Sequence, residues 1–370
     1  MTDWSRLVRP SLVGIEPYRP GASVRELRAV YGLDSLAKLN WNESLFEPYP
    51  GAREAAAAEL ENAWAYPEQS YDDFRDAVAT WLGVPPERIV PAHGVQALVA
   101  TMAGAFLDRG DEVVVPSPTY GLYAQVSAAR GARVRRVPLR EFRIDLPALA
   151  DAVQAAAARL VWICDPNNPT GTLVGQDEWR AFLDALPEGC AVVVDEAYRE
   201  YASPELLVAR ERDVGEGRPV ILLRSFSKLF GLAGLRLAYA VAHESLVPFL
   251  NIVQEPFNVN RAALAAGRAC LEHPEHVEPR RLEAAAAREL LTSLLAEAGL
   301  EPVPSQASFV LVHVGVDDVV LTEALARRGL LVRAGSELGL DGYVRITVGP
   351  EELMQRVVDE LVSARRTLSR

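Results

Sequence analysis

Short apolar runs rich in β-branched residues alternate with longer Ala- and Leu-rich stretches through the middle of the chain. The runs that we predict to be strands are Glu112–Val115, Arg133–Val137, Leu160–Cys164, Ala191–Val194 and Val220–Leu223. The stretches that we predict to be helices include Val95–Leu107, Leu146–Ala157 and Gln176–Leu186. Most of the strands are apolar throughout, which indicates burial on both faces, as in a parallel sheet covered by helices. The pattern predicts an α/β fold.

The last third of the chain follows a different pattern. A long helix is predicted over Glu278–Ala298 and ends at Gly299. The elements predicted after it are strands at Ser308–Val314, Leu330–Arg333 and Tyr343–Val348 and helices at Val319–Arg328 and Glu351–Arg366. We therefore expect a large domain over residues 41–255 and a smaller α+β domain over 256–370. The N-terminal segment, 1–40, is expected to pack with the small domain.

Composition and charge exclude several classes of protein. Of the 370 residues, 49% are hydrophobic and 24% are charged, an ordinary globular balance that excludes disorder and a fibrous role. The net charge of −12 makes nucleic acid an unsuitable partner, because an acidic surface repels phosphate backbones. No stretch reaches the ~18 consecutive apolar residues of a membrane span, so we expect no membrane association.

The cysteines and the start of the chain bear on its location. Cys164, Cys190 and Cys270 have neither the spacing of a disulfide framework nor that of a zinc site, so no metal centre is predicted. Residues Met1–Gly14 lack the long apolar core of a signal peptide. A reducing cytosol is the simplest location, and we predict a cytoplasmic protein.

The first segment that suggests chemistry follows the predicted strand Val220–Leu223. It contains Ser225, Ser227, Lys228 and Arg236. A lysine this close to a core strand is costly if buried, unless it is paired or functional. Lysine, hydroxyl groups and arginine together suit an anionic ligand to which the lysine can bond covalently. The alternative is a surface lysine at a strand end.

Two more buried strands are followed directly by polar residues. After Leu160–Cys164 comes Asp165–Gly171, whose Asn-Pro and Thr-Gly pairs are typical of turns, so a plain loop is the alternative there. After Ala191–Val194 come Asp195 and Tyr198, and a helix N-cap is the alternative role for the aspartate. Ligands of open α/β sheets bind beyond the carboxyl ends of the strands, so we expect the three segments to converge.

With several other short motifs, these segments resemble the fold-type I pyridoxal-phosphate enzymes of the class I and II aminotransferases, and most closely the histidinol-phosphate aminotransferases. The matching pieces follow the family's order and are Asn40-Trp41-Asn42-Glu43, Tyr66-Pro67-Glu68, Pro118-Thr119-Tyr120, Pro166 to Gly171, Asp195 to Tyr198, Ser227-Lys228 through Arg236, and Arg345 to Gly349. The resemblance implies an aspartate-aminotransferase-like fold and pyridoxal 5'-phosphate as cofactor. The implied reaction moves an amino group between an L-amino acid, or histidinol phosphate, and a 2-oxo acid.

The resemblance also implies catalytic roles. Lys228 would form the Schiff base with the cofactor aldehyde and then carry a proton between the substrate α-carbon and the cofactor. Asp195 would keep the pyridine nitrogen protonated, so that the ring can absorb electrons. Asn168 and Tyr198 would hydrogen-bond the ring oxygen. Tyr120 would stack on the pyridine face, with a half-buried core aromatic as the alternative.

The cofactor phosphate needs several hydrogen-bond donors. The side chains implied are those of Ser225, Ser227 and Arg236. The turn Gly94-Val95-Gln96 would add backbone N–H groups at the start of a helix, although Gly94 could also serve a simple turn. In the family, a tyrosine matching Tyr66 reaches this phosphate from the neighbouring subunit, which implies a homodimer with shared active sites.

The substrate would be held by arginine. The resemblance assigns Arg345 to the α-carboxylate, for which a guanidinium offers two parallel donors; a surface strand arginine is the alternative. Arg333 and Tyr18 match residues near the substrate phosphate of histidinol-phosphate aminotransferases, with a free surface arginine as the alternative for Arg333, and Asn42 is a further substrate-binding candidate. The chain departs from the family pattern at Trp41, Ser44-Leu45, Ala97 and Ala334-Gly335-Ser336. The amino donor therefore stays open.

Two rival functions use the same observations. A decarboxylase of an amino-acid phosphate shares the scaffold, and the reaction depends on which α-carbon bond stands perpendicular to the cofactor ring. A non-catalytic regulator that senses amino acids is a candidate of another class. Such regulators usually carry a fused DNA-binding region, and the sequence has no spare basic domain.

Overall fold

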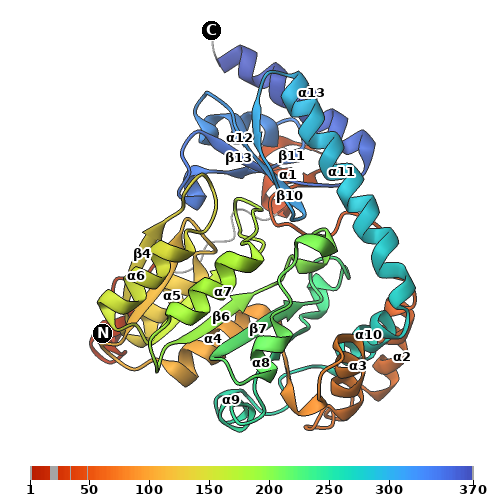
Figure 1. Cartoon of the computed structure of the whole chain (residues 1–370). Coiled ribbons are helices and arrows are strands. Elements are labelled where there is room, and N and C mark those ends of the chain that lie inside the picture. The colour runs from red at the N-terminus through yellow and green to blue at the C-terminus, as the bar shows by residue number, and fades with distance from the viewer. Residues whose placement is uncertain (1, 17–23, 34, 48, 369–370) are drawn as a thin grey trace.

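The computed structural model describes residues 2–16, 24–33, 35–47 and 49–368. A seven-stranded sheet forms the centre of the large domain (Figure 1). Its strands, in spatial order, are β2 (Ile89–Ala92), β8 (Ala238–Val241), β7 (Val220–Ser225), β6 (Ala191–Asp195), β5 (Leu160–Cys164), β3 (Glu112–Ser117) and β4 (Arg133–Pro138). β8 is antiparallel to both neighbours and the other pairs are parallel. The predicted mostly parallel sheet is confirmed.

Helices cover both faces of this sheet. The helices on one face are α4 (Val95–Phe106), α5 (Leu122–Arg130) and α9 (Val247–Val253). Those on the other face are α2 (Ala52–Ala58), α3 (Asp72–Leu82), α6 (Leu146–Ala156), α7 (Gln176–Ala185), α8 (Glu211–Gly215) and α10 (Arg261–Glu272). Every residue of β5 and β6 is buried. Burial between two helical layers is the reason why these strands are apolar throughout.

The small domain is built on a four-stranded antiparallel sheet. Its strands, in spatial order, are β12 (Arg333–Ala334), β13 (Tyr343–Thr347), β10 (Phe309–His313) and β9 (Glu301–Val303). The helices that pack on it are α11 (Val277–Glu297), α12 (Asp318–Ala326) and α13 (Glu351–Leu368). Figure 1 shows this domain above the large sheet, with α11 running up one side of the molecule. The predicted smaller α+β fold is confirmed, but α10, which lies in the range predicted for this domain, packs on the large sheet instead.

The predicted strand Leu330–Arg333 is wrong as a single element. Leu330–Leu331 forms β11, which pairs in parallel with β1 (Ala37–Lys38) in a separate two-stranded sheet. Arg333 starts β12, which pairs with β13. The chain changes sheets at Val332, and a continuous apolar run does not reveal which partner each residue finds.

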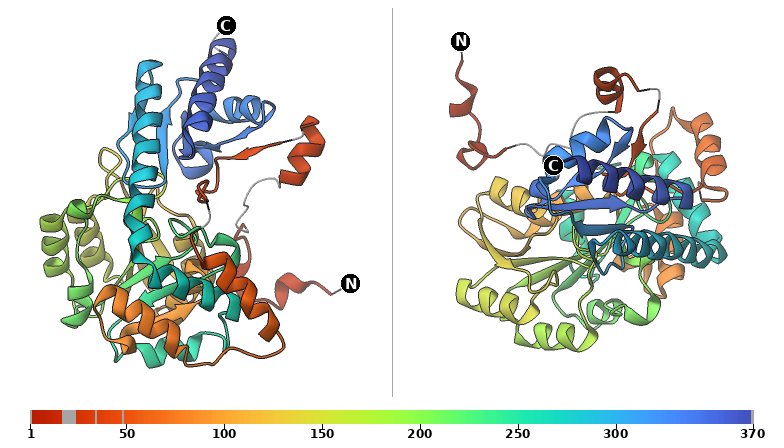
Figure 2. Two further views of the ribbon diagram at one scale, coloured as in Figure 1. Left: turned by 90° about the vertical axis from the view of Figure 1, so that its right-hand side faces the viewer. Right: turned by 90° about the horizontal axis from the view of Figure 1, so that it is seen from above.

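The N-terminal segment contacts both domains. Ser11 Oγ donates a hydrogen bond to the Ala129 carbonyl oxygen (2.9 Å), and Gln125 Nε2 donates to the Glu16 carbonyl oxygen (2.7 Å), so this part lies on α5. Farther along, α1 (Val24–Tyr31) precedes β1, which pairs with β11 beside the small domain. Figure 2 shows the chain start beside the large domain and α13 on the small domain.

Candidate active site

The carboxyl ends of β5, β6 and β7 bring the three predicted segments together beneath the small domain. The Lys228 Nζ atom, from the segment after β7, lies 5.2 Å from the centre of the Tyr198 ring, from the segment after β6. Arg345 of the small domain donates from Nη1 to Asn168 Oδ1, in the segment after β5, at 2.5 Å. The predicted convergence is observed, and the site lies between the two domains.

Lys228 is partly buried and directed at the backbone of the segment that follows β1. Its Nζ atom donates to the carbonyl oxygens of Asn42 (2.9 Å) and Trp41 (3.3 Å). Burial, followed by the positive charge of Arg345, lowers the pKa of Lys228 to about 8. A fraction of the amine is therefore neutral at neutral pH, the form that acts as a nucleophile or base.

Asp195 is a buried carboxylate at the end of β6. Its Oδ2 atom accepts from the Tyr123 hydroxyl (2.6 Å) and its Oδ1 atom from the Ala197 backbone N–H (3.0 Å). Burial raises the pKa of Asp195 to about 6. The N-cap alternative is wrong, because the next helical turn, Arg199–Tyr201, has Tyr198 at its N-cap.

Tyr123 was not among the predicted site residues. Its ring stacks on Trp162 with 5.2 Å between the ring centres and 6° between the planes, which fixes the hydroxyl that Asp195 accepts. It also meets Tyr120 edge-on at 5.4 Å. The only signal for Tyr123 in the sequence was its position one helical turn after Tyr120.

Asn42 connects the N-terminal segment to Tyr198. Its Nδ2 atom donates to the Tyr198 hydroxyl (3.0 Å), and its Oδ1 atom accepts from the Thr347 hydroxyl of β13 (3.1 Å). The Tyr198 ring meets Phe309 of β10 edge-on at 5.2 Å. Three parts of the chain therefore hold the phenol in place.

Arg345 is buried, so the alternative of a surface strand arginine is wrong. Besides Asn168, it donates from Nη2 to the Asn40 carbonyl oxygen (2.6 Å). The centre of the guanidinium lies 5.2 Å from the Phe309 ring centre. A cation held in this way beside Lys228 favours an anionic ligand, since it adds fixed positive charge at the same site.

The turn before α4 and the end of the Lys228 segment meet at a cradle. Gly94 has φ +81°, a conformation that favours glycine, and a Cβ there would lie 2.6 Å from Arg236 Nη2, so a larger residue would displace that guanidinium. Arg236 Nη2 donates to Gln96 Oε1 (3.4 Å), and Gln96 Nε2 donates to the Tyr120 hydroxyl (2.9 Å). Val95 starts α4. A helix start and a guanidinium at one place suit a phosphate.

The family model of the class I and II aminotransferases matches residues 34–361. This chain belongs to that family. The histidinol-phosphate aminotransferase of Symbiobacterium thermophilum (strain DSM 24528 / JCM 14929 / IAM 14863 / T) is 38% identical to this aminotransferase over 96% of the chain and 98% of its own length. The enzyme of the same name from Moorella thermoacetica (strain ATCC 39073 / JCM 9320) is 37% identical over 92% and 88%.

Solved structures agree with this assignment. The aminotransferase aligns with the crystal structure of histidinol-phosphate aminotransferase from Sinorhizobium meliloti in complex with pyridoxal-5'-phosphate, with a TM-score of 0.90, 27% identity and coverage of 98% of both chains. A double mutant of Thermus thermophilus aspartate aminotransferase matches in fold, with a TM-score of 0.82 at 23% identity over 96% of this chain and 99% of its own. The predicted aspartate-aminotransferase-like fold is confirmed.

The other predicted residues of the aminotransferase differ in their surroundings. Ser225 ends β7 and Ser227 follows it; both are buried, and Ser225 Oγ accepts from the Ser227 backbone N–H (3.1 Å). Tyr66 lies at the surface with 79% of its area exposed, and its ring stacks on Phe257 at 4.9 Å. Tyr18 lies outside the described residues.

Arg333 lies on β12 directly opposite Arg345 of β13. Its Nε atom pairs with Glu337 Oε2 at 2.8 Å. The Arg333 side chain is mostly buried, and that of Glu337 is half exposed. Arg333 therefore already has an anionic partner within the chain.

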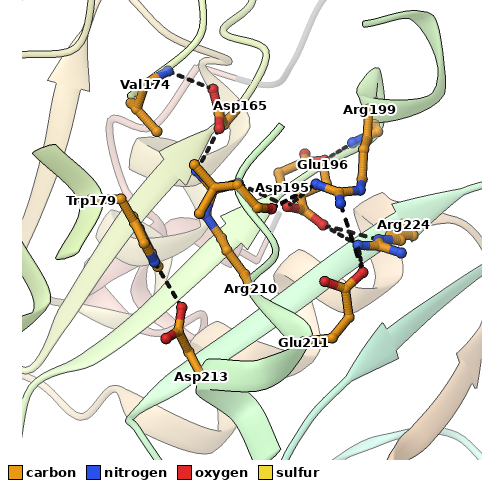
Figure 3. Close-up of polar contacts among 12 residues, drawn as sticks. Asp165, Val174, Trp179, Asp195, Glu196, Arg199, Arg210, Glu211, Asp213 and Arg224 are labelled. Carbon is orange, nitrogen blue, oxygen red and sulfur yellow. Dashed lines mark hydrogen bonds and ion pairs between the residues drawn. The ribbon is translucent and has the colours of Figure 1, made fainter. Parts of the chain in front are cut away.

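A buried ionic network lies behind the site (Figure 3). Arg210 pairs with Asp165 Oδ2 (2.5 Å) and Glu196 Oε1 (2.8 Å), and Arg224 pairs with Glu196 Oε2 (2.8 Å) and Glu211 Oε1 (2.5 Å). Against the effect of burial, the arginines lower the pKa of Glu196 to about 2. Arg210 is 45 and 14 positions from its two partners, so no local pattern predicted the network.

Among the described residues, none of the helices has the length and apolar character needed to cross a membrane. Nor do the described His, Cys, Asp and Glu side chains form a group of three or more that is placed to hold a metal ion.

Proposed function

We propose that this aminotransferase takes the amino group of histidinol phosphate and passes it to a 2-oxo acid. The observation that carries the proposal is the arginine pair, Arg333 and Arg345, at facing positions of β12 and β13. Histidinol phosphate carries a phosphate ester where an amino acid carries its carboxylate, so it needs more positive charge than one guanidinium provides. The two relatives at 38% and 37% identity are both named histidinol-phosphate aminotransferase, which supports the same substrate.

The cofactor of this aminotransferase is pyridoxal 5'-phosphate, and the described residues fit it. The cradle of Gly94, Gln96 and Arg236 suits the phosphate, and Ser225 and Ser227 lie at and just after the carboxyl end of β7. When bound, the cofactor supplies an aldehyde for the amino group and a ring that accepts electrons from the substrate α-carbon.

Lys228 is the residue that we propose to move the proton. Its pKa of about 8 leaves a neutral fraction that accepts a proton from the substrate α-carbon and returns it on the cofactor side. The carbonyl oxygens of Asn42 and Trp41 direct the amine while it is free. The lysine therefore acts as the base and then as the acid.

Asp195 holds a proton on the ring nitrogen in this proposal. The hydrogen bond from Tyr123 and the one from the Ala197 N–H support its anionic form. A cation placed against the carboxylate would lower its pKa further, because opposite charges favour the ionised form. Asn168 and Tyr198 are the proposed partners of the ring oxygen, and Tyr120 is the proposed stacking residue.

Arg345 would bind the α-carboxylate of an amino acid or the phosphate of histidinol phosphate. Its contacts with Asn168 and Asn40 orient the guanidinium before the substrate arrives, which lowers the entropy cost of binding. Arg333 is the proposed second cation for the phosphate. Asn42 and Tyr18 remain predicted substrate-binding residues.

We also propose a cytoplasmic homodimer with shared active sites. Tyr66, whose ring is exposed at the surface, would supply its hydroxyl to the cofactor phosphate of the partner subunit. Its exposure and the exposure of Trp64 next to it support an interface there. Cys164, Cys190 and Cys270 are buried free thiols, which suits a reducing compartment.

The test is a panel of amino donors that includes histidinol phosphate, L-histidine and aromatic amino acids, each added alone to the holoenzyme. Transamination leaves the cofactor in its amine form after one half-reaction, which changes its absorption spectrum. The proposal expects the fastest change with histidinol phosphate. Steady release of carbon dioxide from an amino-acid phosphate, without a lasting spectral change, would support the decarboxylase instead.

A further inference from the structure

The ion pair between Arg333 and Glu337 stands out among the arginine–carboxylate pairs of the small domain. Glu323 of α12 and Arg327, the residue that ends this helix, form a pair of the same i,i+4 spacing, at 2.7 Å against 2.8 Å for Arg333 and Glu337. Both glutamates are 51% exposed. The arginines differ: 64% of the Arg327 side chain is exposed, but only 14% of the Arg333 side chain.

The register of β12 against β13 puts Arg333 on the face of the sheet that carries Arg345. Residues at directly paired positions of antiparallel strands point to the same face. Arg345 reaches Asn168 of the large domain from that face, so Arg333 lies on the side of the active site. Two guanidinium groups at neighbouring positions repel each other unless anions lie beside them, and Glu337 is the anion beside Arg333.

The loop that carries Glu337 is held in place from both sides. Asp318 accepts from the backbone N–H groups of Ser336 (2.8 Å) and Gly342 (3.1 Å), at the two ends of the loop. In the middle, a Cβ on Gly339 would lie 3.6 Å from Pro118 Cβ of the large domain. Glu337 is therefore held on a loop that connects β12 to β13 and approaches Pro118, two residues before Tyr120.

We infer that Glu337 is a specificity-determining residue that competes with the substrate anion for Arg333. This inference rests on the proposed function and deepens it. A carboxylate on the amino carbon is satisfied by Arg345 alone, and it leaves the pair of Arg333 and Glu337 intact. The phosphate of an amino-alcohol phosphate reaches farther, carries more charge and takes Arg333 from Glu337. Binding of a phosphate donor therefore requires that the ion pair between Arg333 and Glu337 breaks.

The experiment compares two donors that differ only in the group on the amino carbon, a carboxylate in L-histidine and a phosphorylated hydroxymethyl group in L-histidinol phosphate. In Glu337→Gln, the kcat/KM for histidinol phosphate should rise about three- to tenfold, as expected when a partly buried ion pair no longer competes. The kcat/KM for L-histidine should stay within about twofold of the wild-type value. Glu323→Gln, which removes the matched glutamate on α12, should change neither.

A double-mutant cycle with Arg333→Gln links the effect to the pair. That change should lower kcat/KM for histidinol phosphate, and adding Glu337→Gln to it should then have no further effect. A rise that persists without Arg333, an equal rise for both donors, or no rise at all would overturn the inference.

Failure of the proposed function leads to a different result. If the wild-type holoenzyme turned over neither donor, calorimetric titration with inorganic phosphate would still decide the role of Glu337. The inference expects Glu337→Gln to bind phosphate more tightly than the wild type and Glu323→Gln to match the wild type. Equal affinity in all three proteins would overturn it.

Discussion

Lys228 and Asp195 carry pKa values that burial has shifted toward neutrality from opposite directions. The amine is lowered to about 8 and the carboxyl is raised to about 6. Both groups therefore change charge near neutral pH, where an acid or base that transfers a proton is most effective. Without the cofactor, the buried negative charge of Asp195 lowers the stability of the protein. A cation on the cofactor ring would remove much of this loss.

Asp195→Asn should stabilise the cofactor-free protein at pH 8 by on the order of 2–3 kcal/mol. The reason is that the native pKa of Asp195 is about 6, above its ordinary value of 3.8, so the native state binds this proton more tightly than the unfolded state. This gain in the free energy of unfolding has its full size above pH 6, shrinks as the pH falls toward 4 and vanishes below that. Urea unfolding of both proteins at pH 4, 6 and 8 measures it; a difference independent of pH would contradict the assignment.

Lys228→Ala should abolish turnover and alter the absorption of the bound cofactor, while the fold stays intact. The side chain is partly buried and its amine contacts only carbonyl oxygens in the hydrogen bonds described, so truncation removes few stabilising contacts. Activity assays with the donor panel, cofactor spectra and circular dichroism measure the three properties. A variant with wild-type turnover would show that another group moves the proton.

The next scale is that of the strands, whose ends present the site. Asp165 follows β5, Glu196 follows β6, and Arg224 belongs to β7. Arg210 and Arg224 join these three positions through Glu196 (Figure 3). The network thereby holds in register the strand ends from which Asn168, Asp195 and Lys228 extend.

Arg210→Met should lower the free energy of unfolding by about 3–5 kcal/mol, because it leaves the Asp165 and Glu196 carboxylates buried without this partner. Arg210 is the N-cap residue of α8, and Arg212→Met in the first turn of the same helix is the matched control. Arg212 forms an exposed pair with Glu216 at 2.7 Å, so its loss should cost less than about 1 kcal/mol. Denaturant unfolding compares the two; similar losses would show that the buried network adds nothing beyond a surface pair.

At the scale of the whole molecule, exposed aromatic side chains gather near α2 and the segment before α10. Trp64, Tyr66 and Phe257 are exposed, and the last two stack on each other. Large apolar groups that remain exposed together are typical of an interface. In the proposed dimer, this surface would bring the Tyr66 hydroxyl to the partner's cofactor phosphate.

A mixing experiment tests the shared sites. Lys228→Ala and Tyr66→Ala should each lose most of their activity, yet co-expression should restore about a quarter of the wild-type level, since half of the randomly formed dimers are hybrids with one intact site. Turnover of the co-purified mixture measures the recovery. Activity equal to the mean of the separate variants would mean that Tyr66 serves its own subunit or no site.

Local pattern was enough to predict the strands that are buried on both faces. β3, β4, β5, β6 and β7 all start where they were predicted to start. Burial between helices demands uninterrupted apolar residues in β3, β5, β6 and β7, whereas β4 is an edge strand whose residues are mostly exposed. β2 and β8 were not predicted, since each has only four residues and includes alanine, with proline in β2. Their place in the sheet comes from pairing with each other and with β7.

The same division applies to the site. Lys228, Asp195 and Asn168 could be proposed from the chain alone, because each follows a predicted parallel strand and the carboxyl ends of such strands lie along one edge. The Tyr123 hydroxyl, the Asn40 carbonyl oxygen, Arg210 and Glu337 became visible only in three dimensions. Each acts through a contact between side chains or backbone groups whose geometry depends on how the two sheets and their loops pack, and no spacing in the sequence encodes that packing.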